Sequence, residues 1–119
     1  MSDEKTELSD LFKLTHELVC IPSESFKEKA IVDFIADKLS KAPWLNITRI
    51  GDNIVAKTSE KTEKRLLLGG HTDTVPAQGN DQIRLSDDSI WGIGSADMKG
   101  GIAIMLSLAL NVPDSAVDM

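Results

Sequence analysis

The sequence has few of the residues that stabilise secreted and membrane-bound proteins. It contains one cysteine, Cys20, which excludes an internal disulfide and leads us to expect a reducing, cytoplasmic location. No apolar run is long enough to span a bilayer, and the acidic first residues carry no apolar signal region. For Cys20 itself, a small buried thiol at a helix end is a simpler interpretation than a nucleophile.

Basic and aromatic residues are also scarce. Lysine and arginine number 13 against 19 aspartates and glutamates, which gives a net charge of −6, and aromatic residues make up 4% of the 119 residues. The sequence has no basic stripe with interleaved aromatics, so we expect neither nucleic acid nor membrane as a partner. The hydrophobic share of 41% is ordinary for one globular domain.

Hydrophobic periodicity predicts an α/β domain. Apolar residues at helical spacing indicate a first helix that ends at Pro22, and residues 25–28, Ser-Phe-Lys-Glu, have the pattern of a capping box for a second helix that ends before Pro43. The further elements expected are a hairpin of 45–50 and 54–57 around a turn at 51–53, a buried strand at 66–68, a ribbon of 83–85 with 89–91, a helix from Asp97 to Asn111, and loops at 59–64 and 77–82. This order predicts a three-layer fold with helices on both faces of a mixed sheet.

Residues 69–76 read Gly-Gly-His-Thr-Asp-Thr-Val-Pro and form the first chemically distinctive stretch. In extended chain, residues two apart point to the same face, so His71 and Asp73 can lie side by side. This geometry suits a histidine that binds a metal through one ring nitrogen while a carboxylate accepts the N–H of the other. A surface histidine that is merely hydrogen-bonded is the simpler alternative for His71 taken alone.

Residues 91–101 read Trp-Gly-Ile-Gly-Ser-Ala-Asp-Met-Lys-Gly-Gly and precede the apolar run 102–110. Asp97 falls just before or within the first turn of the predicted helix, where free N–H groups favour an ionised carboxylate. A plain N-cap is the alternative role for Asp97. Gly100 and Gly101 each cost about 1 kcal/mol relative to alanine in a helix, which suggests that another group approaches the backbone closely there.

Together the two motifs resemble the first two metal-site motifs of the zinc-dependent amidohydrolase and peptidase family that includes acetylornithine deacetylase and succinyl-diaminopimelate desuccinylase. The flanking stretches 21–25, 51–56 and 90–94 also match, so the resemblance extends over residues 18–110. It implies that His71 is the single histidine ligand of one zinc and that Asp97 bridges two zincs. It also implies that Asp73 is the catalytic residue that orients His71, and that the peptide bond after Asp97 is cis.

The resemblance further implies an exopeptidase-like catalytic domain with two Zn²⁺ ions, Co²⁺ being an alternative metal. The substrate would be a small N-acyl amino acid, and the intact protein a homodimer. Within the family, the similarity implies hydrolysis of N-succinyl-diaminopimelate to succinate and diaminopimelate in lysine and diaminopimelate biosynthesis. Another acyl-amino-acid deacylase or a dipeptidase of the same family is the alternative.

Several residues of the family pattern have no match in this sequence, namely a Glu-Glu pair whose first glutamate is the general base, a further acidic ligand and a distant histidine. We therefore expect residues 1–119 to be the N-terminal part of the catalytic domain, without the rest of it and without the dimerisation domain, and to be inactive alone. A non-catalytic fragment is thus an alternative. A nucleotide-binding module is a third, because Gly92 and Gly94 follow a predicted strand. However, Asp97 occupies the third glycine position, where a carboxylate would repel a pyrophosphate.

Overall fold

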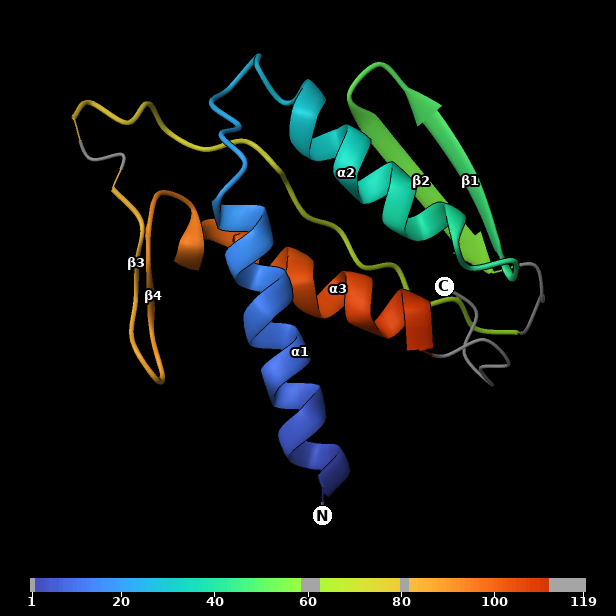
Figure 1. The fold of residues 1–119 in the computed structure, drawn as a ribbon. Helices are drawn as coiled ribbons and strands as arrows, with labels where there is room; N and C mark the ends of the chain where they lie inside the picture. The colour runs from blue at the N-terminus through green and yellow to red at the C-terminus, as the bar shows by residue number, and fades with distance from the viewer. Residues whose placement is uncertain (1, 59–62, 80–81, 112–119) are drawn as a thin grey trace.

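The computed structural model describes residues 2–58, 63–79 and 82–111. Helices and strands are both present, which confirms the α/β class. The elements are α1 (Ser2–Val19), α2 (Lys29–Ser40), β1 (Leu45–Ile50), β2 (Asn53–Thr58), β3 (Arg84–Leu85), β4 (Ile90–Trp91), the π-helical turn η1 (Ser95–Lys99) and α3 (Gly100–Asn111). In Figure 1, α1 crosses α3, and α2 lies against the β1–β2 hairpin. The predicted loops at 59–64 and 77–82 include residues 59–62 and 80–81, which lie outside the described residues.

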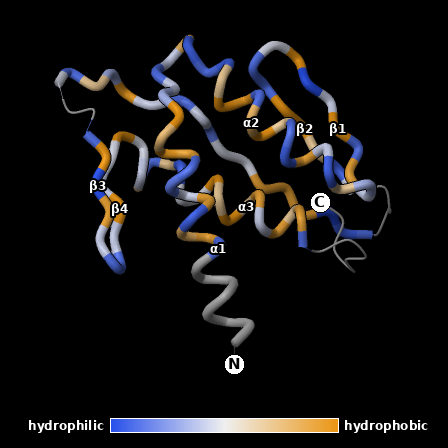
Figure 2. Tube along the Cα trace, in the orientation of Figure 1, coloured by the Kyte–Doolittle hydropathy of each residue, from blue (hydrophilic) through white to orange (hydrophobic). Residues whose placement is uncertain are grey.

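The hydrophobic core lies where the three α-helices meet. Hydrophobic residues recur along α2 and α3 (Figure 2). The buried cluster consists of Leu18, Ile31, Val32, Ile35, Leu39, Ile102, Ala103 and Leu106. Each large apolar side chain buried in this way contributes roughly 1.5–3 kcal/mol to folding. The helices are therefore held together chiefly by apolar contacts, and no helix in the described part of the chain is long and apolar enough to cross a membrane.

Both predicted ribbons are confirmed. β1 pairs with β2 in antiparallel fashion with Ile50 opposite Asn53, which leaves Gly51 and Asp52 as a two-residue loop. Gly51 has a φ of 59°, and glycine adopts such positive φ values in tight hairpin turns at little cost. β3 pairs with β4 in the same sense, with Arg84 opposite Trp91.

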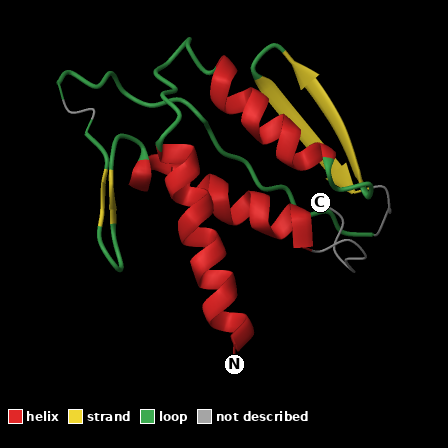
Figure 3. Cartoon of the chain, viewed as in Figure 1, coloured by secondary structure: helices red, strands yellow, loops and turns green. Residues whose placement is uncertain are grey.

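The predicted buried strand at 66–68 is wrong for the described structure. Leu66, Leu67 and Leu68 have exposed fractions of 48%, 86% and 38%, and the stretch 63–79 is drawn as a loop (Figure 3). A strand becomes buried on both faces only when neighbouring strands and outer layers cover it. Each of the two sheets has two strands, and neither includes 66–68. The described residues therefore do not form a three-layer fold.

The predicted capping box at the start of α2 is also wrong. Glu28 occupies the N-cap position but makes no side-chain cap, and its Oε1 instead accepts a hydrogen bond from the backbone N–H of Phe26 at 2.7 Å. The hydroxyl of Ser25 does not cap the helix and donates to Asp73 instead. A tertiary partner has replaced the local one, because a carboxylate binds a hydroxyl more strongly than a backbone amide does.

Cys20 is exposed, so the expectation of a buried thiol is wrong. It follows Val19, the last residue of α1, which is buried together with Leu18. The thiol Sγ lies 3.4 Å from Nε2 of His16, one helical turn back on the same face. The end of α1 therefore directs Cys20 away from the core that its two predecessors enter.

Candidate functional site

His71 and Asp73 lie side by side on the extended stretch 69–76, as their spacing predicts. Nδ1 of His71 is 3.1 Å from the backbone oxygen of Asp73 and 3.2 Å from its carboxylate Oδ1. An N–H at Nδ1 can thus donate either to the backbone oxygen of Asp73 or to its carboxylate. This arrangement leaves Nε2 of His71 facing the other side, where it can act as a ligand.

Asp97 reaches the same imidazole from another part of the chain. Its Oδ1 lies 2.9 Å from Nε2 of His71, and its side chain is 87% exposed. The Asp97–Met98 peptide bond is cis, as the family resemblance implied. The backbone of Asp97 is not helical, and α3 begins only at Gly100. Asp97 therefore precedes the helix rather than belonging to its first turn.

The residues just after α1 hold the histidine segment in place, and we call residues 21–25 the strap. The Ser23 hydroxyl donates to the backbone oxygen of Thr72 at 2.6 Å. The backbone N–H of Thr74 donates to the oxygen of Ser23, and that of Ser25 donates to the oxygen of Thr74. Together with a parallel bridge between Glu24 and Thr74, these bonds pair the strap with residues 72–74 on either side of Asp73.

Lys99 connects the strap to the segment that carries Asp97. Its side chain is buried, with only 2% exposed, and Nζ donates to the backbone oxygen of Ile21 at 2.7 Å. Removal from water lowers the pKa of Lys99. The segment with His71 and the segment with Asp97 are therefore both hydrogen-bonded to the strap.

Gly70 allows the segment with His71 to lie close to the segment with Asp97. A Cβ at Gly70 would lie 2.7 Å from Cε of Met98, the residue after Asp97. The backbone N–H of His71 donates to Sδ of Met98 at 3.4 Å. A Cβ added at Gly101 would lie 3.1 Å from the same Cε. The close approach expected at Gly100 and Gly101 is thus made by the protein itself, by the backbone oxygen of Ser95 at Gly100 and by the side chain of Met98 at Gly101.

The contacts of the site shift two pKa values in opposite directions. The backbone oxygen of Asp73 raises the pKa of His71, and the carboxylates of Asp97 and Asp73 act in the same sense, against the effect of desolvation. The hydroxyl of Ser25 lowers the pKa of Asp73, and the positive charge of His71 adds to this effect. The site therefore favours a charged imidazole between two carboxylates when no cation competes.

The donor set fits part of a zinc site. Imidazole nitrogen and carboxylate oxygen are ordinary zinc ligands, and a catalytic zinc commonly takes three ligands from protein. His71 and Asp97 supply one of each at a common point. No group of three or more histidine, cysteine, aspartate or glutamate side chains able to hold a metal occurs within residues 2–58, 63–79 and 82–111. The metal roles of His71 and Asp97 therefore stay predictions.

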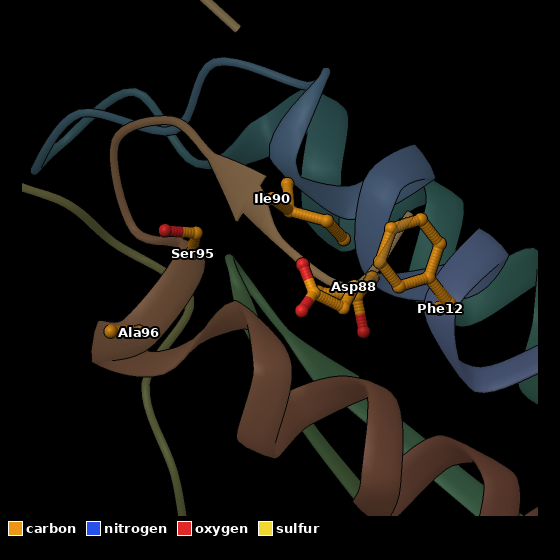
Figure 4. Close-up of a pocket in the computed structure, with 6 residues that line it drawn as sticks. Phe12, Asp88, Ile90, Ser95 and Ala96 are labelled. Carbon is orange, nitrogen blue, oxygen red and sulfur yellow. The ribbon is translucent and has the colours of Figure 1, made fainter. Parts of the chain in front are cut away.

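A pocket of about 290 Å³ lies beside this site rather than at it (Figure 4). Its lining comes from α1, from the ribbon and from the start of η1: Phe12, Thr15, Asp88, Ile90, Ser95 and Ala96. Ser95 and Ala96 directly precede Asp97, but neither His71 nor Asp97 lines the pocket. We assign it no role in the site.

Ser23 and Ser25 are the site residues that sequence reasoning missed. The signal was their spacing, because two serines separated by one residue after Pro22 share a face in extended chain. The capping pattern at Ser25 led to a local interpretation instead. Identifying their contacts required the pairing of the strap with 72–74, which joins residues 48 and 49 positions apart.

Comparison with known proteins adds independent findings. Residues 67–118 match the sequence profile of peptidase family M20/M25/M40. The chain is 40% identical over 111 residues to a protein of Mycobacterium tuberculosis named provisionally as a succinyl-diaminopimelate desuccinylase, covering 92% of this chain and 31% of that protein. It is 41% identical over 101 residues to the succinyl-diaminopimelate desuccinylase of Corynebacterium glutamicum, covering 83% and 27%.

A third relative, from Pyrococcus abyssi, is named provisionally as a LysW-lysine/LysW-ornithine hydrolase. It is 38% identical over 95 residues, which is 79% of this chain and 27% of that protein. The chain thus spans about a third or less of the length of the curated relatives it matches.

Proposed function

Because the chain belongs to peptidase family M20/M25/M40, we propose that it forms part of a zinc-dependent hydrolase that cleaves N-succinyl-diaminopimelate into succinate and diaminopimelate. The observation that carries this proposal is the contact of 2.9 Å between His71 and Asp97, which come from motifs 26 residues apart. The names of two relatives from different bacteria support the choice of substrate.

In this proposal each residue of the site has a separate task. His71 would hold zinc through Nε2, and Asp73 accepts a hydrogen bond from the N–H at Nδ1, which fixes the tautomer of the ring and its orientation. Asp97 would supply a carboxylate ligand, which the family resemblance implies is shared by two ions. The bound ions supply Lewis acidity that polarises the amide carbonyl of the substrate. The high exposure of Asp97 leaves room for ligands from outside the described residues.

The complete protein is proposed to contain the remaining ligands and the general base. The mixed sheet with helices on both faces is proposed for that protein, where further strands would cover the exposed leucines at 66–68. A homodimeric state and a cytoplasmic location belong to the same proposal. The 119 residues by themselves, with two of the ligands, are proposed to be inactive.

A substrate panel tests the proposed activity. We expect the complete protein, loaded with zinc, to release diaminopimelate from N-succinyl-diaminopimelate at least about 100-fold more efficiently than it cleaves N-acetylornithine or an unmodified dipeptide. A site that binds a charged group of the substrate rejects analogues lacking that group by factors of this size or more. Chromatography of the products measures the rates. Faster cleavage of either competitor would exclude the desuccinylase assignment.

A second candidate is the hydrolysis of a different amide by the same metal centre. The similarity to the protein of Pyrococcus abyssi favours it, since that protein carries the name of a hydrolase for lysine and ornithine attached to a partner called LysW. Both candidates use the same roles for His71, Asp73 and Asp97. Hydrolysis of a LysW-lysine or LysW-ornithine conjugate, without hydrolysis of N-succinyl-diaminopimelate, would favour this second candidate.

Zinc binding is expected to weaken as the pH falls through the raised pKa of His71. Zinc at Nε2 must displace the proton that this nitrogen donates to Asp97, so the observed affinity should fall about tenfold for each pH unit below the pKa. The contacts with Asp73 and Asp97 raise that pKa above 6.5, so the fall should begin above pH 6.5. Competition with a chelating dye at constant ionic strength measures it. An affinity that stays constant down to pH 6.5 would contradict the expected proton displacement.

A further inference from the structure

Ser25 is bound to Asp73 on the side away from His71. Its Oγ lies 2.6 Å from Oδ2 of Asp73, while Oδ1 of the same carboxylate lies 3.2 Å from Nδ1 of His71. A contact of 2.6 Å is typical of a hydroxyl that donates to an ionised carboxylate. The two oxygens of Asp73 therefore have different partners, one on each side.

This division of partners restricts the rotation of the carboxylate. The terminal torsion of an aspartate is broad, so a carboxylate bound through one oxygen can turn about its axis. With Oδ2 held by Ser25, rotation would break a short charge-assisted hydrogen bond. Oδ1 is thereby kept toward the histidine.

Ser25 is held chiefly by its backbone, and its hydroxyl makes a second, longer contact of 3.4 Å with the oxygen of Thr74. Its N–H donates to the oxygen of Thr74 at 3.1 Å, and its neighbour Glu24 forms the parallel bridge with Thr74. The hydroxyl is thus delivered from a paired segment that is fixed relative to Asp73. Ser23, two residues earlier, donates to the backbone oxygen of Thr72 instead and does not contact the carboxylate.

We infer that Ser25 is a positioning residue of the candidate metal centre, which holds the Asp73 carboxylate toward Nδ1 of His71 and so presents Nε2 to the metal. This inference rests on the proposed function for the metal, but the orientation of the ring is a property of the protein alone. Among the described residues, the Ser25 hydroxyl bonds to Asp73 and Thr74 and not to His71 or Asp97, so its effect on the site passes through Asp73.

The matched pair Ser25→Ala and Ser23→Ala tests the inference in the complete protein. Each change removes one hydroxyl from the strap and one hydrogen bond of 2.6 Å to the histidine segment, but only the first releases Asp73. Loss of such outer partners commonly costs 10–100-fold in metal affinity. Because Ser25 lies one contact further out than Asp73, we expect Ser25→Ala to weaken zinc binding by roughly tenfold. Ser23→Ala also loosens the histidine segment but leaves Asp73 bound to Ser25, so it should weaken zinc binding less than Ser25→Ala does.

Two further measurements separate positioning from general loss of structure. Nitrogen NMR of the metal-free protein, at a pH where the imidazole is neutral, gives the share of His71 with its proton on Nδ1. This share should fall in Ser25→Ala, stay unchanged in Ser23→Ala, and return in Ser25→Thr, which keeps a hydroxyl. In the zinc-loaded enzyme, Ser25→Ala should lower kcat with little change in KM, because the change acts on the orientation of His71 and not on substrate binding.

Equal effects of the two alanine variants on the tautomer, or no effect of either, would overturn the inference. The proposed function fails separately, if the wild-type protein neither binds zinc nor cleaves an amide. In that case the tautomer comparison, which needs no metal, still decides whether Ser25 positions Asp73.

Discussion

Replacing His71 by alanine is expected to lower the affinity of the complete protein for zinc by more than about 100-fold and to abolish measurable hydrolysis. Outer partners of a ligand are already worth 10–100-fold, and this change removes the ligand itself. It also leaves Asp97 without the partner that now lies 2.9 Å from its Oδ1. Calorimetric zinc titration, together with an amide-cleavage assay, measures both losses.

The sequence supplies a matched control for this variant. His16 is the other of its 2 histidines, and its ring contacts Cys20, the residue just after α1, rather than the site. His16→Ala should therefore bind zinc and turn over as the wild type does, to within about twofold. Zinc affinity in His71→Ala close to that of His16→Ala would mean that the imidazole of His71 is not a ligand.

The parts of the fold that sequence predicted correctly depend on local chemistry. The β1–β2 hairpin follows from a strand-like stretch on each side of Gly51, and the β3–β4 ribbon from turn residues between two short apolar runs. The adjacency of His71 and Asp73 follows from the two-residue period of extended chain. In each case the residues that decide the outcome are close together in the sequence.

The errors concern residues whose surroundings come from distant parts of the chain. Three consecutive leucines at 66–68 indicate burial, but burial depends on strands that the described sheets do not provide. The capping pattern at Ser25 was outcompeted by Asp73, 48 positions away. The meeting of His71 with Asp97 was not evident from spacing either. It was expected only because the two motifs together resemble a known family.

Gly94→Ala is expected to lower the free energy of unfolding by about 2–5 kcal/mol, through two separable costs. Gly94 has a φ of 81°, a conformation that costs about 1–2 kcal/mol for residues with a Cβ. The added Cβ would also lie 2.6 Å from Cγ2 of Thr74. Thr74 is fixed by its pairing with the strap, so the overlap cannot be relieved cheaply, and overpacking of this kind costs about 1–3 kcal/mol.

Two other glycines isolate these costs. Gly51 has a φ of 59°, and a Cβ added there would meet no atom within 4 Å apart from its chain neighbours, so Gly51→Ala reports backbone strain alone, at about 1–2 kcal/mol. Gly92 has no positive φ, but its Cβ would lie 2.5 Å from Cγ1 of the buried Val19, so Gly92→Ala reports crowding alone, at about 1–3 kcal/mol. Urea unfolding of the complete protein should rank Gly94→Ala as the most destabilising. If it costs no more than Gly51→Ala, Thr74 moves aside freely, and the strap does not fix the segment that carries His71.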